Sequence, residues 1–408
     1  MAAASKTVEI TLGIVTSVGG FLEIGSIATA AQAGALFGYQ LLWAVVLGGV
    51  CVAFLVEQSG RLAAVSGRPI PAAIRERFGF RYYFVLVTVI AAVSVLVLGA
   101  EIGGICIALE FATGIGYRWW AVPAAFAVWL VLWKGKFSAI EQGVSFLGLV
   151  TICFIVAAFK LGPDWRSVAL AALPSLPQHD ASRYWFVAVS ILGASVSPYL
   201  MFFYSSGAIE DKWNPSYLGA NRAIAGGGMA FGTLISIAVL IVAALVLLPR
   251  GIELDHYSKL AMLLDDAFGR WGLVLIIASL AVACLGAALE IALALSYMVA
   301  QGLGWNWSEN PSPRREARFC CAYTIVVLLG CLFALCGPDP LKLTNLSMAL
   351  TAATLPIAIV PFLFVMNDPR YMKNRPNGRM SNGIVLFVIG LAFVLAIVSL
   401  PLELFGGG

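Results

Sequence analysis

The sequence predicts an all-α membrane protein with eleven transmembrane helices in a single domain over residues 1–408. Three observations support this prediction. First, 61% of the residues are hydrophobic and 11% are charged, whereas a soluble domain is about half apolar and about a quarter charged. Second, charge-poor stretches recur that are long enough to cross a bilayer, which takes about 20 residues. Third, two of these stretches carry helix-breaking residues near their centres.

The charge-poor stretches define the predicted spans in chain order. Their bounds are 8–36, 39–58, 82–112, 119–135, 138–160, 184–209, 219–248, 268–304, 319–336, 342–366 and 383–402. The eighth is long enough for one tilted span and too short for two spans and a loop. An odd number of crossings places the two chain ends on opposite sides of the membrane.

Lysine and arginine indicate the orientation, because cytoplasmic loops are enriched in them. With the N-terminus cytoplasmic, 17 of the 25 Lys and Arg residues fall on the inside. The prediction is a multi-pass protein of the cell (inner) membrane with a cytoplasmic N-terminus and an extracytoplasmic C-terminus. The net charge of +4 is small and reflects these basic loops, so no nucleic-acid partner is expected.

Two spans contain residues that interrupt a helix at mid-membrane. The first contains Glu23, Gly25 and Ser26 near its centre, and the sixth contains Pro198. A proline lacks the amide hydrogen that would bond to the carbonyl four residues earlier, so the carbonyl of Ala194 is released. Backbone groups freed at that depth are tolerated only where they line a cavity or are buried in protein.

The two breaks lie five spans apart. That spacing fits two inverted repeats over 8–160 and 184–366, followed by an additional helix over 383–402. Broken helices at matching positions of two repeats indicate a substrate site near the membrane midplane.

The ionisable residues predicted to lie deep in the membrane are all acidic. They are Glu23, Glu101 and Glu290, with Glu110 and Glu141 nearer the span ends. No Lys or Arg is predicted deep enough to pair with them, and a buried charge is usually functional, paired or neutralised. The missing partner is therefore expected to be a mobile cation. Glutamates that stay protonated or hydrogen-bonded within the bundle remain the alternative, above all for Glu290.

Four segments resemble the Nramp family of divalent-metal transporters. They are GFLEIGSIATAAQAGALFGYQLLW at 20–43, GRPIPAAIRERF at 67–78, AEIGG from residue 100, and MNDPRYM at 366–372. The resemblance covers nearly the whole chain in the same order. It implies a LeuT-type fold of two inverted five-helix repeats with helices 1 and 6 broken. It also implies a transporter rather than an enzyme, with divalent metal ions and the lipid bilayer as partners and no cofactor. We further expect a monomer.

The resemblance also assigns residues to a metal site. The implied metal-binding groups are Glu23, Ser26, the carbonyl of Ala194 and Ser197, and the residues implied beside them or along the pathway are Gly25, Glu101, Pro198 and Tyr199.

The chain departs from the family pattern at these positions. The family's Asp-Pro-Gly-Asn reads Glu23-Ile24-Gly25-Ser26, and the methionine before the span-6 proline is replaced by Ser197. Thioethers suit soft transition metals, whereas Mg²⁺ and Mn²⁺ prefer oxygen, and Mg²⁺ retains several waters. This pattern most resembles the divergent magnesium-transporting branch of the family.

The family's proton route is also altered. Its span-6 histidines fall on Tyr199 and Tyr204, and the aspartate one turn before Glu101 falls on Leu98. The only two histidines lie in predicted external loops, and a proton relay needs groups that titrate in range.

We therefore expect alternating-access transport of Mg²⁺ and Mn²⁺ without proton coupling. The first alternative is a proton-coupled Mn²⁺/Fe²⁺ symporter. The second is a LeuT-type amino-acid symporter, which is disfavoured because a deep glutamate at the break would repel the carboxylate of the substrate. An intramembrane enzyme is disfavoured because no histidine is predicted at membrane depth to serve a zinc site or a Ser-His pair.

Overall fold

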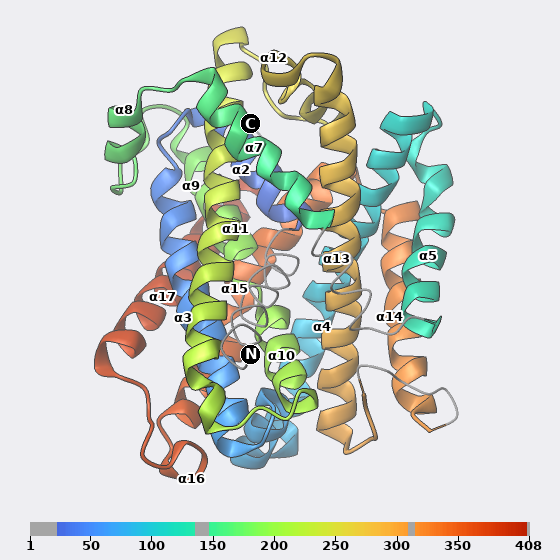
Figure 1. Ribbon diagram of the computed structural model, residues 1–408, viewed down its shortest axis with the longest axis vertical. Helices are drawn as coiled ribbons and strands as arrows, with labels where there is room; N and C mark the ends of the chain where they lie inside the picture. Colours follow the sequence, from blue (N-terminus) through green and yellow to red (C-terminus); the bar gives the residue numbers. More distant parts are fainter. Residues whose placement is uncertain (1–22, 135–146, 309–314, 406–408) are drawn as a thin grey trace, which may run out of the picture.

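The computed structural model describes residues 23–134, 147–308 and 315–405. Within these ranges the regular structure is helical, and the long helices stand side by side in one bundle (Figure 1). Three sequence predictions lie outside the described residues. They are the N-terminal part of the first span (8–22), the start of the fifth span (138–146), and the depth of Glu141.

In the described part of the chain, twelve long helices form the bundle, and shorter helical turns connect them. The long helices are α2 (Ile24–Phe37), α3 (Leu42–Ser66), α4 (Ile70–Thr113), α5 (Ala121–Lys134), α7 (Ile152–Leu161), α9 (Ala181–Ser195), α10 (Pro198–Glu210), α11 (Leu218–Val246), α13 (Arg270–Leu303), α14 (Ala317–Cys336), α15 (Pro340–Met366) and α17 (Arg379–Phe405). The short α-helices are α8 (Trp165–Leu170), α12 (Asp265–Phe268) and α16 (Pro369–Met372). The 3-10 turns are η1 (Tyr117–Trp120), η2 (Leu149–Thr151), η3 (Pro215–Tyr217), η4 (Leu248–Arg250) and η5 (Tyr257–Met262).

Each predicted span coincides with a described helix. Eight segments of the described chain are long and apolar enough to cross a membrane, with α9 and α10 counted as one segment. The other three predicted spans correspond to α2, α5 and α7. Residues that are not described lie directly before Glu23 and directly after α5, and five residues separate the second of these segments from α7. The prediction of an all-α membrane protein is confirmed.

Two predicted boundaries were wrong. The second span was expected to end at residue 58, but α3 continues to Ser66, because the charged Arg61 lies beyond the apolar stretch and is still helical. The third span was expected to begin at residue 82, but α4 begins at Ile70 and bends at Gly79, whose φ of 83° lies in the left-handed region that favours glycine. Residues before the bend, such as Arg75 and Arg77, are charged and excluded from an apolar stretch. They are nevertheless good helix formers, so the helix starts outside the apolar region and turns into it at Gly79.

The two interrupted spans occupy the centre of the bundle. All residues of α2 except Leu36 are buried, and α2 packs against α9, α11 and α15. Backbones approach closely here. A Cβ on Gly193 of α9 would lie 1.9 Å from the carbonyl oxygen of Met348 on α15. Close packing of this kind is typical of small residues in membrane helices.

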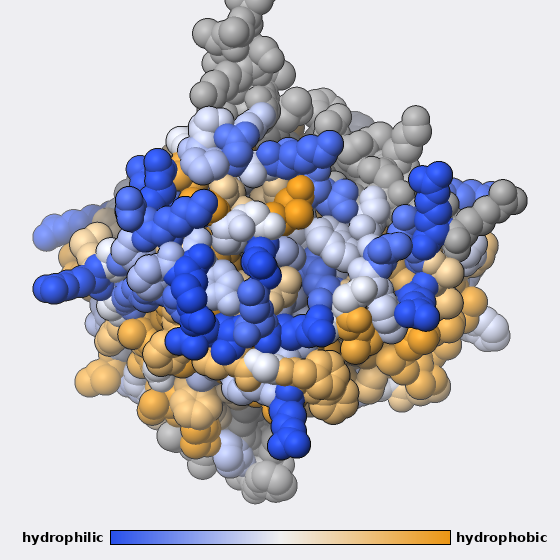
Figure 2. All heavy atoms as spheres, turned by 90° about the horizontal axis from the view of Figure 1, so that it is seen from below, coloured by the Kyte–Doolittle hydropathy of each residue, from blue (hydrophilic) through white to orange (hydrophobic). Residues whose placement is uncertain are grey.

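The ends of the bundle differ in charge. The described Lys and Arg residues near the ends of α3, α10 and α15 and near the starts of α4, α11, α14 and α17 lie at one end of the bundle, where α16 is also located (lower end in Figure 1). We call it the basic end. Figure 2 shows this face, where hydrophilic side chains gather in the middle and apolar side chains lie mainly toward the lower edge of the view.

Two of the segments that carry the family resemblance meet at the basic end. The Asp368 carboxylate lies 2.9 Å from Arg77 at the start of α4 and 2.6 Å from Arg370 in α16. Hydrogen bonds from Arg370, together with the nearby charge of Arg77, lower the pKa of Asp368 to about 2. Asp368 also accepts a hydrogen bond from the backbone amide of Arg370 at the start of α16. The same carboxylate thus stabilises this turn and links the segment at 366–372 to α4.

Candidate ion site at the two helix breaks

The sixth predicted span is interrupted by two extended residues, as expected. Helix α9 ends at Ser195, Val196 and Ser197 have φ values of −120° and −87°, and α10 begins at Pro198. Proline cannot donate a hydrogen bond, so the buried carbonyl of Ala194 has no helical donor four residues later. The break arises from the local sequence.

The break in the first span is described from its C-terminal side. Helix α2 begins at Ile24, and Glu23 precedes it in an extended conformation with φ −117° and ψ 167°. Its side chain is 1% exposed. The helix thus begins next to the carboxylate that the sequence placed at mid-span.

The two breaks meet at Glu23. The hydroxyl of Ser197 donates to Glu23 Oε1 at 3.3 Å, and the hydroxyl of Tyr199 donates to Glu23 Oε2. All three side chains are buried. Glu23 and Ser197 each precede the first residue of a helix, and helix N-termini carry partial positive charge. No Lys or Arg was predicted deep enough to pair with Glu23. The amide groups at the N-termini of α2 and α10 supply part of that positive charge.

Glu101 has a role that the sequence did not predict. It lies on α4 and is fully buried, and both of its carboxylate oxygens accept from the backbone amide of Ile24, at 3.1 and 3.2 Å. This amide is one of the first donors of α2, which have no partner within the helix. Glu101 caps α2 from another helix. The 77-residue separation between the partners leaves no local signal for this contact.

A thioether lies beside Gly25, although span 6 lacks the methionine of the family pattern. Met348 of α15 is buried, and a Cβ on Gly25 would lie 2.7 Å from its Sδ atom. Span 6 does lack the methionine, as Ser197 shows, but another helix brings a thioether to the first turn of α2. Nothing around Met348 in the sequence marks it, because its position depends on how α15 packs against α2.

The remaining predicted residues lie as follows. Ser26 is buried in the first turn of α2. The Gly25 carbonyl accepts from Thr29 Oγ1 at 2.7 Å. Glu290 is buried on α13. Among the described residues no three His, Cys, Asp or Glu side chains cluster as metal ligands would. An ion held at the breaks would therefore need hydroxyl, carbonyl or water oxygens besides carboxylate.

The residues that replace the family's proton route have other contacts. Tyr204 donates to Asn221 of α11 at 3.1 Å. Leu98 is buried, and a Cβ on Gly330 of α14 would lie 2.7 Å from it. His179 lies 3.2 Å from the Leu36 carbonyl oxygen, and His256 lies 3.5 Å from Asp339. Both histidines lie in loops at the end of the bundle opposite the basic end (Figure 1).

The bundle with its paired central breaks defines a multi-pass membrane protein of the LeuT-type fold. A solved structure of the Eremococcus coleocola manganese transporter superposes with a TM-score of 0.75 and 18% identity, covering 97% of this chain and 87% of that chain. Two relatives named "Divalent metal cation transporter MntH" match over nearly full length. The one from Caldanaerobacter subterraneus subsp. tengcongensis is 26% identical over 94% of this chain and 90% of its own. The one from Klebsiella pneumoniae subsp. pneumoniae is 27% identical over 93% and 90%.

The profile of the family described as "Natural resistance-associated macrophage protein-like" (Nramp) matches residues 13–401. The chain belongs to the Nramp family.

Proposed function

We propose that this protein transports divalent metal cations, and that it moves Mg²⁺ and Mn²⁺ by alternating access without carrying protons. The observation that carries this proposal is the buried Glu23 carboxylate, which lies between the two helix breaks and contacts Ser197 and Tyr199. The names of the relatives, which refer to divalent metal cations and manganese, support the substrate class.

In the proposed site, Glu23, Ser26, the Ala194 carbonyl and Ser197 surround the ion, partly through water. Glu23 Oε1 and Ser197 Oγ lie 3.3 Å apart, so they can serve as neighbouring ligands of one ion. In the described state the serine hydroxyl directs its hydrogen to the carboxylate. On ion binding it would rotate and present a lone pair instead, since hydroxyl rotors are free to do so.

We also propose the repeat boundaries and the orientation. The inverted repeats cover 8–160 and 184–366, with 383–402 as the additional helix. The basic end is cytoplasmic, because basic residues are enriched in cytoplasmic loops. The protein then has a cytoplasmic N-terminus and an extracytoplasmic C-terminus, and we propose that it functions as a monomer.

A proton-coupled Mn²⁺/Fe²⁺ symporter is the second candidate function. One observation favours it: the thioether of Met348 lies beside Gly25, and a soft ligand of this kind suits transition metals. The retained carboxylate of Glu101 could also accept a proton. An amino-acid symporter has less support, because an acidic side chain at the break repels a substrate carboxylate.

Transport of Mg²⁺ into proteoliposomes should respond to voltage and not to a pH gradient. An inside-negative potential contributes about 2.3 kcal/mol per charge per 100 mV, hence about twice that for a divalent ion. We expect faster Mg²⁺ and Mn²⁺ uptake at negative potential and no acidification of the lumen, as read by a trapped pH-sensitive dye. Protein-free liposomes are the control. Metal-dependent acidification in proportion to flux would support the symporter instead.

Replacing Ser197 by methionine should shift ion preference toward soft metals. The Ser197→Met variant exchanges a hard ligand for a soft one and fills space that water would occupy, so we expect weaker Mg²⁺ transport and tighter Cd²⁺ binding. Isothermal titration and uptake assays with both ions measure the shift. Ser197→Ala is the matched control, since it removes the hydroxyl without adding sulfur. A higher ratio of Mg²⁺ to Cd²⁺ transport in Ser197→Met would contradict the proposed ligand chemistry.

A further inference from the structure

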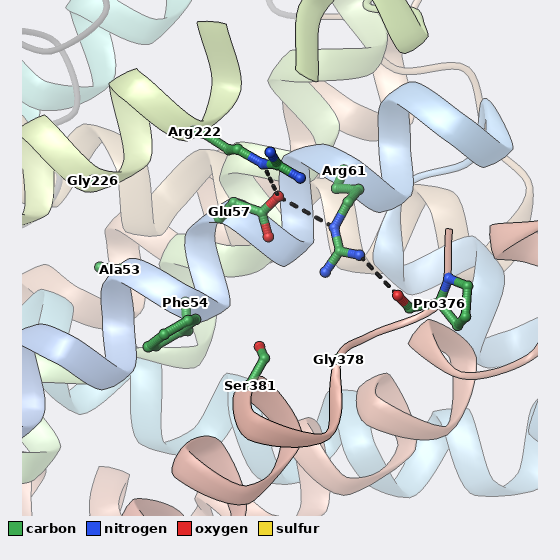
Figure 3. A pocket seen from close by; sticks show the side chains of 9 residues that line it. All are labelled: Ala53, Phe54, Glu57, Arg61, Arg222, Gly226, Pro376, Gly378 and Ser381. Atoms are coloured by element: carbon green, nitrogen blue, oxygen red, sulfur yellow. Dashed lines mark hydrogen bonds and ion pairs between the residues drawn. The ribbon is translucent and has the colours of Figure 1, made fainter. Parts of the chain in front are cut away.

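A cavity of about 470 Å³ lies away from the helix breaks, at the basic end, between α3, α11 and the segment that leads into α17 (Figure 3). It is lined by Ala53, Phe54, Glu57, Arg61, Arg222, Gly226, Pro376, Gly378 and Ser381. Neither the candidate site nor the resemblance to the family accounts for it.

The rim of the cavity carries more positive than negative charge. One carboxylate oxygen of Glu57 lies 3.2 Å from Arg61 Nε and 3.8 Å from Arg222 Nε. A single carboxylate thus serves two guanidinium groups. The other donors of Arg61 bond to neutral acceptors, the carbonyl oxygens of Arg375 and Pro376 and the Asn377 side chain.

The two arginines differ in freedom. The Arg61 side chain is 12% exposed and is fixed by these bonds, whereas the Arg222 side chain is 74% exposed. Arg222 can therefore reorient toward a ligand, while Arg61 provides a charge at a fixed position.

The deeper wall of the cavity is apolar. Ala53 and Phe54 lie about one turn before Glu57 on α3, and Gly226 lies one turn after Arg222 on α11. Because α3 ends and α11 begins at the basic end, all three lie closer to the membrane centre than the charges do. A Cβ on Gly226 would meet no atom within 4 Å, so the space beside it is open.

We propose that this cavity binds an anionic phospholipid, with the phosphate at Arg222 and Arg61 and the glycerol and upper acyl chain along Ala53, Phe54 and Gly226. The exposed Arg222 guanidinium can pair with the phosphate through two parallel hydrogen bonds, and Arg61 adds a positive charge at a fixed position. Basic pockets between membrane helices recognise anionic head groups. A free phosphate would use the charged rim and leave the apolar wall uncovered. The proposal is independent of the transported ion.

Bound lipid would lie beside a hydrogen-bond network that connects α3 to α10 through Asn221 of α11. Asn221 donates to the Glu57 carbonyl at 2.8 Å and accepts from Tyr204 of α10 at 3.1 Å. Helix α10 begins at the break in the sixth span, so lipid at the rim would reinforce contacts of a helix that forms the candidate site.

Native mass spectrometry of the full-length protein can test this proposal. With equal amounts of phosphatidylglycerol and phosphatidylcholine of the same acyl chains, we expect selective retention of phosphatidylglycerol. Arg222→Gln should lower that selectivity about fivefold, the effect of one basic residue on binding to an anionic lipid surface. Gly226→Leu should reduce lipid retention without altering charge, because its side chain fills the open space. Arg81→Gln, an exposed arginine at the same end that does not line the cavity, should change nothing.

Three outcomes would overturn the proposal. If Arg81→Gln reduces selectivity as much as Arg222→Gln, the effect is one of general surface charge. If inorganic phosphate displaces the lipid at equal concentration and Gly226→Leu has no effect, the site takes a free anion. If both cavity variants retain phosphatidylglycerol as the wild type does, the cavity binds no lipid. A thermal unfolding curve for each variant establishes that the comparison is made on folded protein.

Discussion

Glu23→Ala is expected to abolish saturable uptake of Mg²⁺ and Mn²⁺ by proteoliposomes. The substitution removes the carboxylate that lies between the two breaks and contacts Ser197 and Tyr199. Loss of one partner of a buried charge pair weakens an interaction by about 3–5 kcal/mol, which is at least a hundredfold in ion affinity. Radiotracer or fluorescent-dye uptake over a range of ion concentrations measures the effect.

Two further variants make the test of Glu23 specific. Glu23→Asp keeps a carboxylate and should retain measurable uptake. Glu110→Ala removes a partly exposed carboxylate near the end of α4, where it accepts from the Tyr117 amide, and should leave uptake unchanged. If Glu23→Ala is folded and transports both ions like the wild type, the proposed site is wrong.

Gly193→Ala is expected to reduce the stability of the folded protein severely. An added Cβ would lie 1.9 Å from the Met348 carbonyl oxygen and 2.8 Å from its carbonyl carbon. These are backbone atoms of α15, so no side chain can rotate away and the two helices must separate. Overpacking of this kind costs typically about 1–3 kcal/mol and occasionally more, and we expect a value at or above the top of that range.

The unfolding temperature in detergent and the yield of monodisperse protein measure this loss. Gly390→Ala in α17 is the matched control, because a Cβ there would meet nothing within 4 Å. Alanine also favours the helix over glycine by up to about 1 kcal/mol, so the control should be at least as stable as the wild type. Equal unfolding temperatures for the two variants would show that α9 and α15 are not packed as described.

The bundle could be predicted because its determinants are local in sequence. Each span is an apolar stretch of sufficient length. The break before α10 follows from the missing amide hydrogen of Pro198. The error at the start of α4 has a local origin too. An apolar stretch marks the residues that lie in the membrane, whereas the helix that contains them can begin outside it. The charged turn before Gly79 is helical although it lies outside the apolar stretch.

The candidate site could be predicted only in part. Glu23 and Ser197 were identified because each lies in a helix break that the sequence marks. The capping of α2 by Glu101 and the approach of Met348 to Gly25 were missed, because both depend on packing between helices far apart in the chain. The replacement of the span-6 methionine by Ser197 removes a thioether from that break, and the packing of α15 brings the thioether of Met348 to the first turn of α2 instead.

The bond between Glu101 and the first amide of α2 has a kinetic consequence. Any motion that moves α2 away from α4 must break it, and losing a buried hydrogen bond without a replacement costs about 1–3 kcal/mol. A barrier raised by that amount slows a conformational step roughly fivefold to a hundredfold. Because both carboxylate oxygens share one donor, the side chain can lose one contact and keep the other. The separation of the two helices would then occur in stages, so that the speed of the transport cycle depends on a residue that need not contact the ion.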